Sequence, residues 1–299
     1  MITILGPTAT GKTSFAVYVA AQLNGEVISA DSRQVYKGMD IGTGKDLSEY
    51  QFNEQTIPHH LIDIVDPGYE YNVFEYQRDF LKAYEAIEER GSFPILCGGT
   101  GMYIESVLKG YKLINVPVNE QLREDLALKL DEELEQILDT FKALHNTTDT
   151  SDRDRLLRAI EIQTYYDEHP DLDTSFPKID SILVGLDFDR RVVRSRITDR
   201  LEERLKGGMI DEVEGLLDEG VSEEKLKFYG LEYRFVTQYI SGEISYDELF
   251  RRLNTAIHQF AKRQMTWFRR MEKQGFEIHW LDGNHSHEQK MMQLMTLLK

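Results

Sequence analysis

The segment GPTATGKTS, Gly6 to Ser14, constrains the fold of this chain more than any other feature, and it lies close to the first residue. It matches the pattern G-x-x-x-x-G-K-[ST] in full. The apolar run ITIL precedes it, and SFAVYVAAQL, with apolar residues at helical spacing, follows it. A glycine-rich loop between a strand and a helix directs backbone amides at a polyphosphate, where Lys12 neutralises charge and Thr13 can bind Mg²⁺. We therefore predict a phosphate site made of Gly6, Pro7, Thr8, Ala9, Thr10, Gly11, Lys12 and Thr13.

The loop alone does not show which phosphate compound binds. The chain has no Asn-Lys-x-Asp segment, which disfavours a GTPase. It also has no convincing apolar run that ends in a lone Asp, as an ATPase would need. A net charge of -17 argues against indiscriminate nucleic-acid binding and leaves a local basic groove possible.

Composition also indicates the cellular compartment of the protein. The single cysteine, Cys97, excludes a disulfide within the chain and fits a reducing cytoplasm. No apolar run approaches the roughly 18 residues that span a bilayer, and no secretory signal stands at the start. We expect a cytoplasmic protein without membrane contact.

Strands alternate with helices along most of the sequence. We expect strands at ITIL, EVISAD, HLIDIVDPG, FPILCGG, SILVGLDFDR and FEIHWL, with helices between them. This order predicts an α/β fold, a P-loop NTPase-like parallel sheet flanked by helices. Residues 115–178 differ because leucines recur there every fourth position, with a break near Asp131. We predict an all-helical insertion at 115–178 within a core of residues 1–114 and 179–299.

Two further motifs follow predicted strands. Asp31, in SADSRQVYKGMDIGTGK, stands at the carboxyl end of the second strand, the edge that the phosphate loop also faces. It is a candidate base or metal ligand, with a helix N-cap as the alternative. In CGGTGMY, the glycines allow close approach of a ligand and Thr100 supplies a hydroxyl, although a plain turn has the same pattern.

One predicted helix carries a stripe of arginines. Arg196, Arg200 and Arg204 are four residues apart and share one face. The alternative is a solvated face paired with Glu202 and Glu203. The pairs His59-His60 and His285/His287 lack nearby cysteines and suitable spacing, so we expect no zinc site.

The motifs occur together in a recognisable order. GPTATGKT, DSRQVYKGMDIGTGK, GGTGMY, RSRITDRLEERLKGG, ISGEISYDEL and AKRQMTWFRR resemble the tRNA dimethylallyltransferases, also called tRNA isopentenyltransferases, over nearly the whole chain. The resemblance implies transfer of a dimethylallyl group from dimethylallyl diphosphate to N6 of the adenosine just 3′ of the anticodon (position 37) of tRNA. The loop would then bind the diphosphate that is released.

The resemblance also implies roles for residues. Asp31 corresponds to the family's general base, Thr100 to a threonine that places the reacting groups, and Arg155 to an arginine used in substrate binding and catalysis. Arg200 corresponds to a diphosphate-side arginine. The residues implied for tRNA binding, including a flipped base, are Asp31, Ser32, Arg33, Gln34, Asp154, Arg155, Arg158, Lys262 and Arg263. Trp267 could stack on a base or belong to the core. Mg²⁺ is the implied cofactor, and we expect a monomer.

Three departures from the family pattern lie where tRNA contact is expected. Arg153 replaces a proline, Ile257-His258 replaces Thr-Arg, and Glu232 replaces a glycine. Three other functions stay open. An adenylate isopentenyltransferase would act on free nucleotides, although the insertion favours tRNA. A small-molecule P-loop kinase would consume ATP, and a non-catalytic tRNA-binding module would need no Asp31.

Overall fold

The computed structural model describes residues 1–141, 152–171 and 175–298. The chain divides into two compact units, Met1–Tyr111 with Pro177–Lys299, and Lys112–Phe176. The expected division, after residues 114 and 178, lies within three residues of these limits. In the described residues, no helix is long and apolar enough to cross a membrane.

A six-stranded sheet forms the centre of the larger unit, and every strand pair in it is parallel. Its order is β5-β2-β6-β1-β7-β8. The strands are β1 (Ile2–Leu5), β2 (Gly25–Ala30), β5 (His59–His60), β6 (Phe93–Gly98), β7 (Ile182–Asp187) and β8 (Ile278–Asp282). The predicted α/β class with a parallel sheet is confirmed. A short antiparallel pair, β3 (Gln51–Phe52) and β4 (Gln55–Thr56), stands apart from this sheet.

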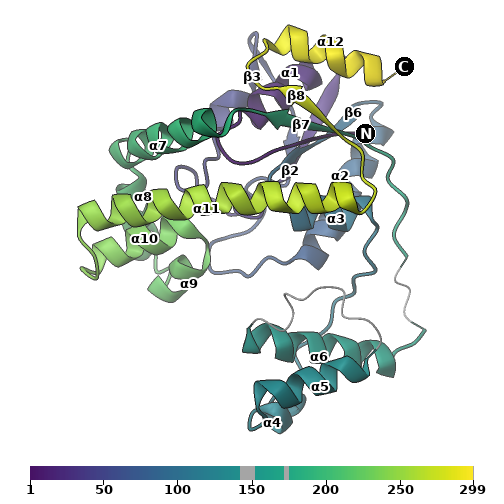
Figure 1. The fold of residues 1–299 in the computed structure, drawn as a ribbon, viewed down its shortest axis with the longest axis vertical. Helices are drawn as coiled ribbons and strands as arrows, with labels where there is room; N and C mark the ends of the chain where they lie inside the picture. The colour runs from purple at the N-terminus through teal and green to yellow at the C-terminus, as the bar shows by residue number, and fades with distance from the viewer. Residues whose placement is uncertain (142–151, 172–174, 299) are drawn as a thin grey trace. The chain divides into compact units, whose positions relative to one another are not determined.

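Helices cover both faces of the sheet (Figure 1). On one face, α1 (Lys12–Leu23) and α12 (His287–Leu297) bury Phe15 and Leu294 against Ile2 and Ile4 of β1. On the other face lie α2 (Val73–Glu89) and α3 (Gly101–Leu108), whose Tyr76 and Tyr103 rings stack at 3.8 Å. A capping box at Asn72 starts α2, because its side chain accepts from the amide of Glu75.

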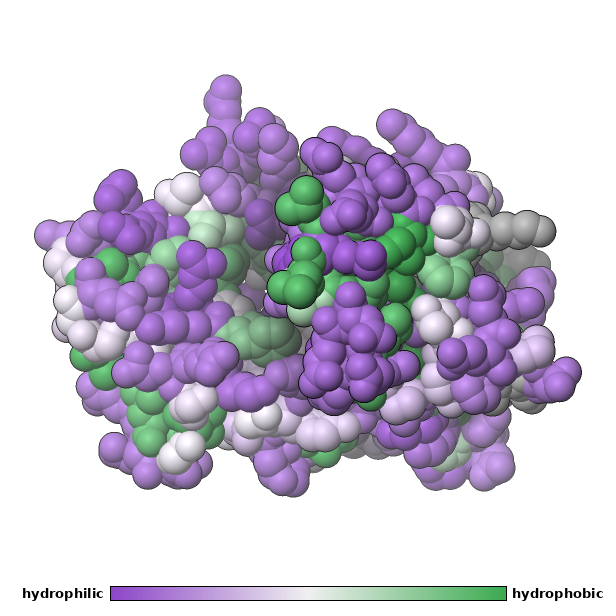
Figure 2. Space-filling view, turned by 90° about the horizontal axis from the view of Figure 1, so that it is seen from below, coloured by the Kyte–Doolittle hydropathy of each residue, from purple (hydrophilic) through white to green (hydrophobic). Residues whose placement is uncertain are grey.

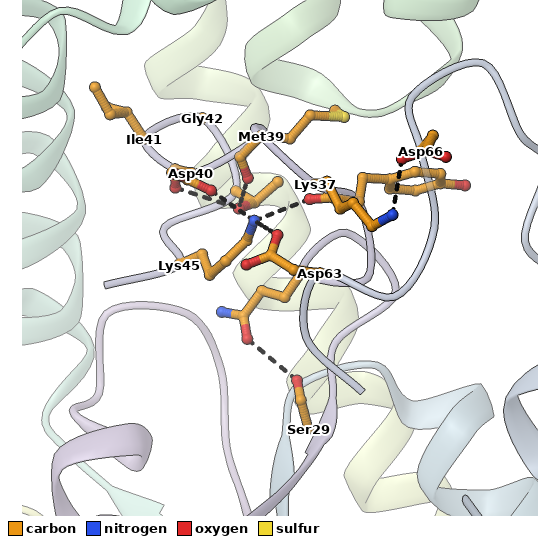
Figure 3. Close-up of polar contacts among 12 residues, drawn as sticks. Ser29, Lys37, Met39, Asp40, Ile41, Gly42, Lys45, Asp63 and Asp66 are labelled. Atoms are coloured by element: carbon orange, nitrogen blue, oxygen red, sulfur yellow. Dashed lines mark hydrogen bonds and ion pairs between the residues drawn. The ribbon is translucent and has the colours of Figure 1, made fainter. Parts of the chain in front are cut away.

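The expected strand HLIDIVDPG is wrong beyond its first residue. Only His59 and His60 pair with β2, and Val65 adds one isolated bridge to Tyr36. Leu61 and Asp63 have left-handed backbone angles, φ 60° and 55°, which a strand cannot accommodate. The segment instead follows the loop after β2, because the amides of Asp63 and Ile64 donate to the carbonyls of Gln34 and Val35, and Asp63 pairs with Lys45 (Figure 3).

A second apolar cluster joins the segment after β2 to a group of helices. These are α7 (Arg190–Lys206), α8 (Met209–Asp218), α9 (Glu223–Phe228), α10 (Leu231–Ile240) and α11 (Tyr246–Lys273). The cluster buries Tyr36 and Met39 against Leu201, Met209 and Tyr233. The segment between β2 and the short 3₁₀ helix η1 (Leu47–Tyr50) is therefore packed against these helices despite having little regular structure.

The smaller unit is helical in the residues described, with α4 (Glu120–Leu126), α5 (Asp131–Thr140) and α6 (Arg153–Glu168). Its apolar core includes Leu126, Leu134, Leu138 and Ile160. The predicted break near Asp131 is confirmed, since α4 ends at Leu126 and α5 begins at Asp131.

The surface is largely polar, in keeping with the net charge of -17. Figure 2 shows hydrophilic residues over most of one face, interrupted by separate hydrophobic groups. The most exposed large apolar side chain described is Leu128, 97% exposed in the α4–α5 connection, and Leu130 beside it is 67% exposed. The leucines at intervals of four are therefore not all core residues.

Candidate active site

A cavity of about 920 Å³ opens where the strands of the sheet end. Loops from three strands line it: the phosphate loop after β1, the segment after β2 and the loop after β6. Side chains of α7, α10 and α11 form the remaining wall. The carboxyl ends of parallel strands are the usual place for ligands in open α/β sheets.

The phosphate loop has a conformation suited to an anion. Gly6, Ala9 and Gly11 all have positive φ angles, of 155°, 64° and 72°. No side chain caps α1 at Gly11, so the first amides of the helix stay available to a ligand. Lys12 donates to the carbonyl of Pro7 at 2.7 Å, and burial lowers the pKa of its ammonium. A bound polyanion would offset that burial.

Asp31 and Thr100 lie at neighbouring strand ends, as predicted. Asp31 Oδ1 accepts from the amide of Arg33 at 2.9 Å, which holds the carboxylate at the cavity wall. Thr100 Oγ1 accepts from the amide of Ser32 at 3.0 Å, and its own amide donates to Ala30. These bonds tie the loop after β6 to the loop after β2. Thr100 thereby positions the segment that carries Asp31.

Gln34 and Arg200 meet at one backbone carbonyl. Gln34 Oε1 accepts from Ser29 Oγ at 3.1 Å, and its Nε2 lies 3.5 Å from the oxygen of Gly44. Arg200 Nη2 donates to the same oxygen at 3.3 Å. Gly44 has a φ of 68°, and a Cβ on it would overlap the guanidinium groups of Arg200 and Arg204. Glycine is therefore required here both for its backbone angle and for space.

The loop around Gly44 is held by two charged residues that the motifs did not single out. Glu212 of α8 accepts hydrogen bonds from the amides of Asp40, Ile41 and Gly42, and from Tyr233 Oη at 2.7 Å. It fills a nest of amides that would otherwise suit a bound anion. Its spacing in the sequence does not distinguish it from the other acidic residues of α8, although in the fold Glu212 is half-buried and the others are exposed.

Lys45 holds the other side of this loop. Its side chain is fully buried and donates to Tyr36 O at 2.9 Å and to Asp40 Oδ1 at 2.6 Å, and it pairs with Asp63 (Figure 3). A buried ammonium needs this number of acceptors because its hydration is lost.

Gln264 of α11 links two of the ligand-facing loops. Its Oε1 accepts from the amide of Thr8, and its Nε2 donates to the carbonyl of Gly99, both at 2.9 Å. The phosphate loop and the loop after β6 therefore keep a fixed separation. The motif AKRQMTWFRR contains this residue, but spacing alone did not show its role.

Trp267 lies at the cavity and packs against the backbone of Gly101, where a Cβ would overlap the indole. Arg270 stacks on its ring at 3.9 Å. The core residue of this helix turn is Phe268, which is fully buried. Base stacking by Trp267 stays a prediction.

The predicted tRNA-binding residues fall into three groups. Arg33 and Arg263 line the cavity together with Asp31, Ser32 and Gln34. Lys262 is exposed on α11 and does not line it. Asp154, Arg155 and Arg158 belong to the smaller unit.

Within the smaller unit, Arg155 is exposed, and Arg158 is held by partners of its own. Arg158 pairs with the buried carboxylate of Glu161 and donates to Val116 O at 2.6 Å. Arg123 also pairs with Glu161, at 3.1 Å. Arg158 therefore has a structural role in the helical unit, and contact with tRNA stays a prediction for all three residues.

The three departures have different surroundings. Glu232 and Ile257 line the cavity, whereas His258 lies 3.4 Å from Thr198 Oγ1 on the adjoining helix. Arg153 donates to the carbonyls of Ala127 and Lys129, both at 2.9 Å, and pairs with Asp131. Arg153 therefore links the end of α4 to the start of α5.

Oxygen ligands near Thr13 fit a magnesium ion. The hydroxyl of Thr13 hydrogen-bonds the carboxylate of Glu49, which also lines the cavity. Burial raises the pKa of Glu49, and Asp46 adds to this effect. The described residues contain no cluster of three or more His, Cys, Asp or Glu side chains. A magnesium ion here would take most of its ligands from substrate phosphates and water, as Mg²⁺ commonly does.

Comparisons with known proteins place this geometry in a family. The IPP transferase family model matches residues 34–271, and the isopentenyl transferase model matches residues 1–56. The tRNA dimethylallyltransferase 2 of Bacteroides fragilis is 57% identical over 299 residues, which are 100% of this chain and 98% of that protein. The chain belongs to the IPP transferase family.

Solved structures agree with this assignment. A tRNA isopentenylpyrophosphate transferase from Bacillus halodurans is 31% identical, with a TM-score of 0.72 over 99% of this chain and 94% of that chain. A eukaryotic dimethylallyltransferase acting on tRNA is 24% identical, with a TM-score of 0.77 over 95% of this chain and 73% of that one, and shows the shared fold. In IPP transferases the fold is P-loop NTPase-like, as the sequence predicts.

Proposed function

We propose that this protein transfers a dimethylallyl group from dimethylallyl diphosphate to N6 of the adenosine at position 37 of tRNA, with release of diphosphate. The proposal rests on one observation: the phosphate loop, Asp31 and Thr100 line the same cavity. A relative that is 57% identical over the whole chain carries the name tRNA dimethylallyltransferase. Action as a monomer on cytoplasmic tRNA is part of the proposal.

The diphosphate would occupy the phosphate loop. Amides of the loop and of the start of α1, with Lys12 and Arg200, face the charge that grows on the leaving group as the C–O bond breaks. The reaction replaces that bond by a C–N bond to the adenosine and frees one proton. Mg²⁺, held by Thr13 and the diphosphate, would supply further charge neutralisation.

Asp31 would receive the proton from N6. Its Oδ1 is occupied by the amide of Arg33, so the carboxylate keeps a fixed orientation while Oδ2 remains for the nucleophile. Thr100 orients the neighbouring Ser32, and Arg33, Gln34 and Arg263 would contact the extruded base and its neighbours. We propose Lys262, Asp154 and Arg158 as further tRNA contacts, and Arg155 as the residue that corresponds to the family's arginine for substrate binding and catalysis.

Nucleoside analysis distinguishes this function from its alternatives. Total tRNA and, separately, AMP are incubated with the protein, Mg²⁺ and dimethylallyl diphosphate, and the digested products are examined by mass spectrometry. We expect prenylated adenosine from tRNA only. Prenylated AMP with unmodified tRNA would make the protein an adenylate isopentenyltransferase, and ATP consumption without prenylation would make it a kinase.

The Asp31→Asn variant tests the base. It keeps the acceptor for the amide of Arg33 and removes the proton acceptor, so we expect kcat to fall by about 10²–10⁴-fold with an unchanged melting temperature. A variant that transfers at the normal rate would remove Asp31 from the mechanism. Chelation by EDTA, with recovery on adding Mg²⁺, tests the metal, and equilibrium binding of the diphosphate with and without Mg²⁺ gives a readout apart from activity.

A further inference from the structure

Arg204 is a cation of the cavity wall that the proposed function leaves unused. It lies on α7 one turn after Arg200, and its guanidinium packs against Gly44 beside that of Arg200. Among the described residues, nothing forms a hydrogen bond or a close ion pair with this guanidinium. Burial, with repulsion from Arg200, lowers the pKa of Arg204 to about 10. A half-buried cation without a partner favours binding of an anion.

The surroundings of Arg204 place it on the acceptor side of the cavity. Its guanidinium lies against Gly44, whose carbonyl oxygen is 3.5 Å from Nε2 of Gln34, a proposed contact of the extruded base. Arg200 donates to the same carbonyl, and its charge also acts on Lys12 of the phosphate loop. Arg204, one turn further along α7, therefore lies beside Gly44 and Gln34.

Among the carboxylates, Glu232 acts most strongly on the pKa of Arg204. It stands in the first turn of α10, lines the cavity, and has its own backbone amide as a hydrogen-bond donor. Burial raises its pKa, and Arg204 counteracts this shift most strongly. The carboxylate offsets the repulsion between Arg200 and Arg204 while the cavity holds no substrate.

We propose that Arg204 binds a phosphodiester oxygen of the tRNA next to the target nucleotide, and that Glu232, on the same cavity wall, balances its charge in the absence of RNA. The proposal rests on the proposed function, since it assigns a backbone phosphate of that same acceptor. The diphosphate already has Lys12, Arg200 and the start of α1, so a further cation beside Gly44 and Gln34 matches the RNA strand that carries the adenosine. A phosphate contact there fixes the register of the flipped nucleotide and does not read its sequence.

The Arg204→Met variant tests the contact, with Lys206→Met, which removes an exposed cation from the same helix, as the matched control. Equilibrium binding of a tRNA substrate is measured over a range of salt concentrations, and KM for dimethylallyl diphosphate is measured separately. We expect Arg204→Met to weaken tRNA binding about 5–50-fold. It should also reduce the slope of log K against log salt by about 0.7, the value for one single-strand phosphate. KM for the diphosphate should stay within about twofold, and Arg204→Lys should recover part of the affinity.

Unchanged tRNA affinity and salt slope in Arg204→Met would overturn the proposal. A raised KM for the diphosphate with a normal salt slope would assign Arg204 to the leaving group and overturn it equally. Failure of the wild-type protein to prenylate tRNA would instead defeat the proposed function, so the two failures are distinguishable.

A double-mutant cycle tests Glu232. The variant Glu232→Gln keeps the shape of the side chain and removes its charge, so the charge of Arg204 is no longer balanced and tRNA affinity should change in the wild-type background. The same substitution in Arg204→Met should have no further effect, because the partner is absent. Fully additive effects would show that Glu232 acts independently and would overturn its role as counter-ion.

Discussion

Gln264 Oε1 accepts a hydrogen bond of 2.9 Å from the amide of Thr8, 256 residues earlier in the chain. The other end of the same amide group donates to Gly99 at 2.9 Å. One side chain therefore fixes the distance between the loop expected to hold the leaving group and the loop that carries Thr100. A small shift between those loops would separate the reacting atoms.

Gln264→Glu tests this link, because it keeps the size of the side chain and loses the donor to Gly99. We expect kcat to fall about 10–100-fold, with a destabilisation of about 1–3 kcal/mol from the unsatisfied buried carbonyl. Transfer to tRNA and thermal melting are measured together. Gln293→Glu, at an exposed position of α12, is the control and should match the wild type. Normal kcat in Gln264→Glu would show that the separation of the loops does not depend on this amide.

Lys45→Met should destabilise the protein, because it leaves the carboxylates of Asp40 and Asp63 without their cation and the carbonyl of Tyr36 without its donor. Since Asp40 is half-exposed and solvent screens the remaining charges, we expect a loss of about 1–3 kcal/mol and a fall of about 2–12 °C in the thermal midpoint. Lys37→Met is the matched control, since its pair with Asp66 is exposed and is worth about 0–1 kcal/mol (Figure 3). Equal midpoints for the two variants would contradict the anchoring role of Lys45.

Glu212→Gln should weaken the loop that presents Gly44. The amide that replaces the carboxylate has one acceptor oxygen for the three backbone donors of Asp40, Ile41 and Gly42. We expect a loss of about 1.5–3 kcal/mol and faster hydrogen exchange at these amides. Glu214→Gln, exposed on the same helix, should leave both quantities unchanged. Exchange rates that do not change at residues 40–42 would contradict the role of Glu212.

The pH dependence of stability should depend on Glu26. Hydrogen bonds from Arg90 lower the pKa of its carboxyl to about 2; burial opposes this effect and a hydrogen bond with His60 adds to it. Because the folded pKa lies below the ordinary value of 4.5, this contribution is complete above about pH 4.5 and is lost as the pH falls toward 2.

Glu26→Gln removes that titration. It should be less stable than wild type at pH 7, and the difference should shrink between pH 4.5 and 3, as measured by unfolding in urea at several pH values. Glu89→Gln, exposed at the end of α2, is the control. A difference that stays constant down to pH 3 would contradict the shifted pKa.

Most of the fold followed from local patterns in the sequence, and the exceptions have physical causes. The strand β1, the capped start of α2 and the break before Asp131 follow from periodicity and capping. The segment 60–68 has a strand's composition, but left-handed backbone angles at Leu61 and Asp63 end the strand, and Asp63 pairs with Lys45. That attraction is between residues 18 positions apart, and no local pattern records it.

The candidate site was predictable where motifs end strands, as at Asp31 and Thr100. Its supports were not, because Glu212, Gln264 and Arg204 act from helices far along the chain. Their side chains resemble those of ordinary polar surface residues until the fold brings them to the loops. The stripe that includes Arg200 and Arg204 was visible as a pattern, but only the cavity distinguishes it from a solvated face.

Glu212 has a consequence for how substrates are received. Because the protein supplies its own anion to the amides of residues 40–42, the backbone there has its final shape before any phosphate arrives. When RNA binds, this part of the cavity wall is already ordered. Binding therefore does not have to order residues 40–42. The entropy of ordering that segment is lost during folding, so it does not reduce the affinity for the proposed substrates.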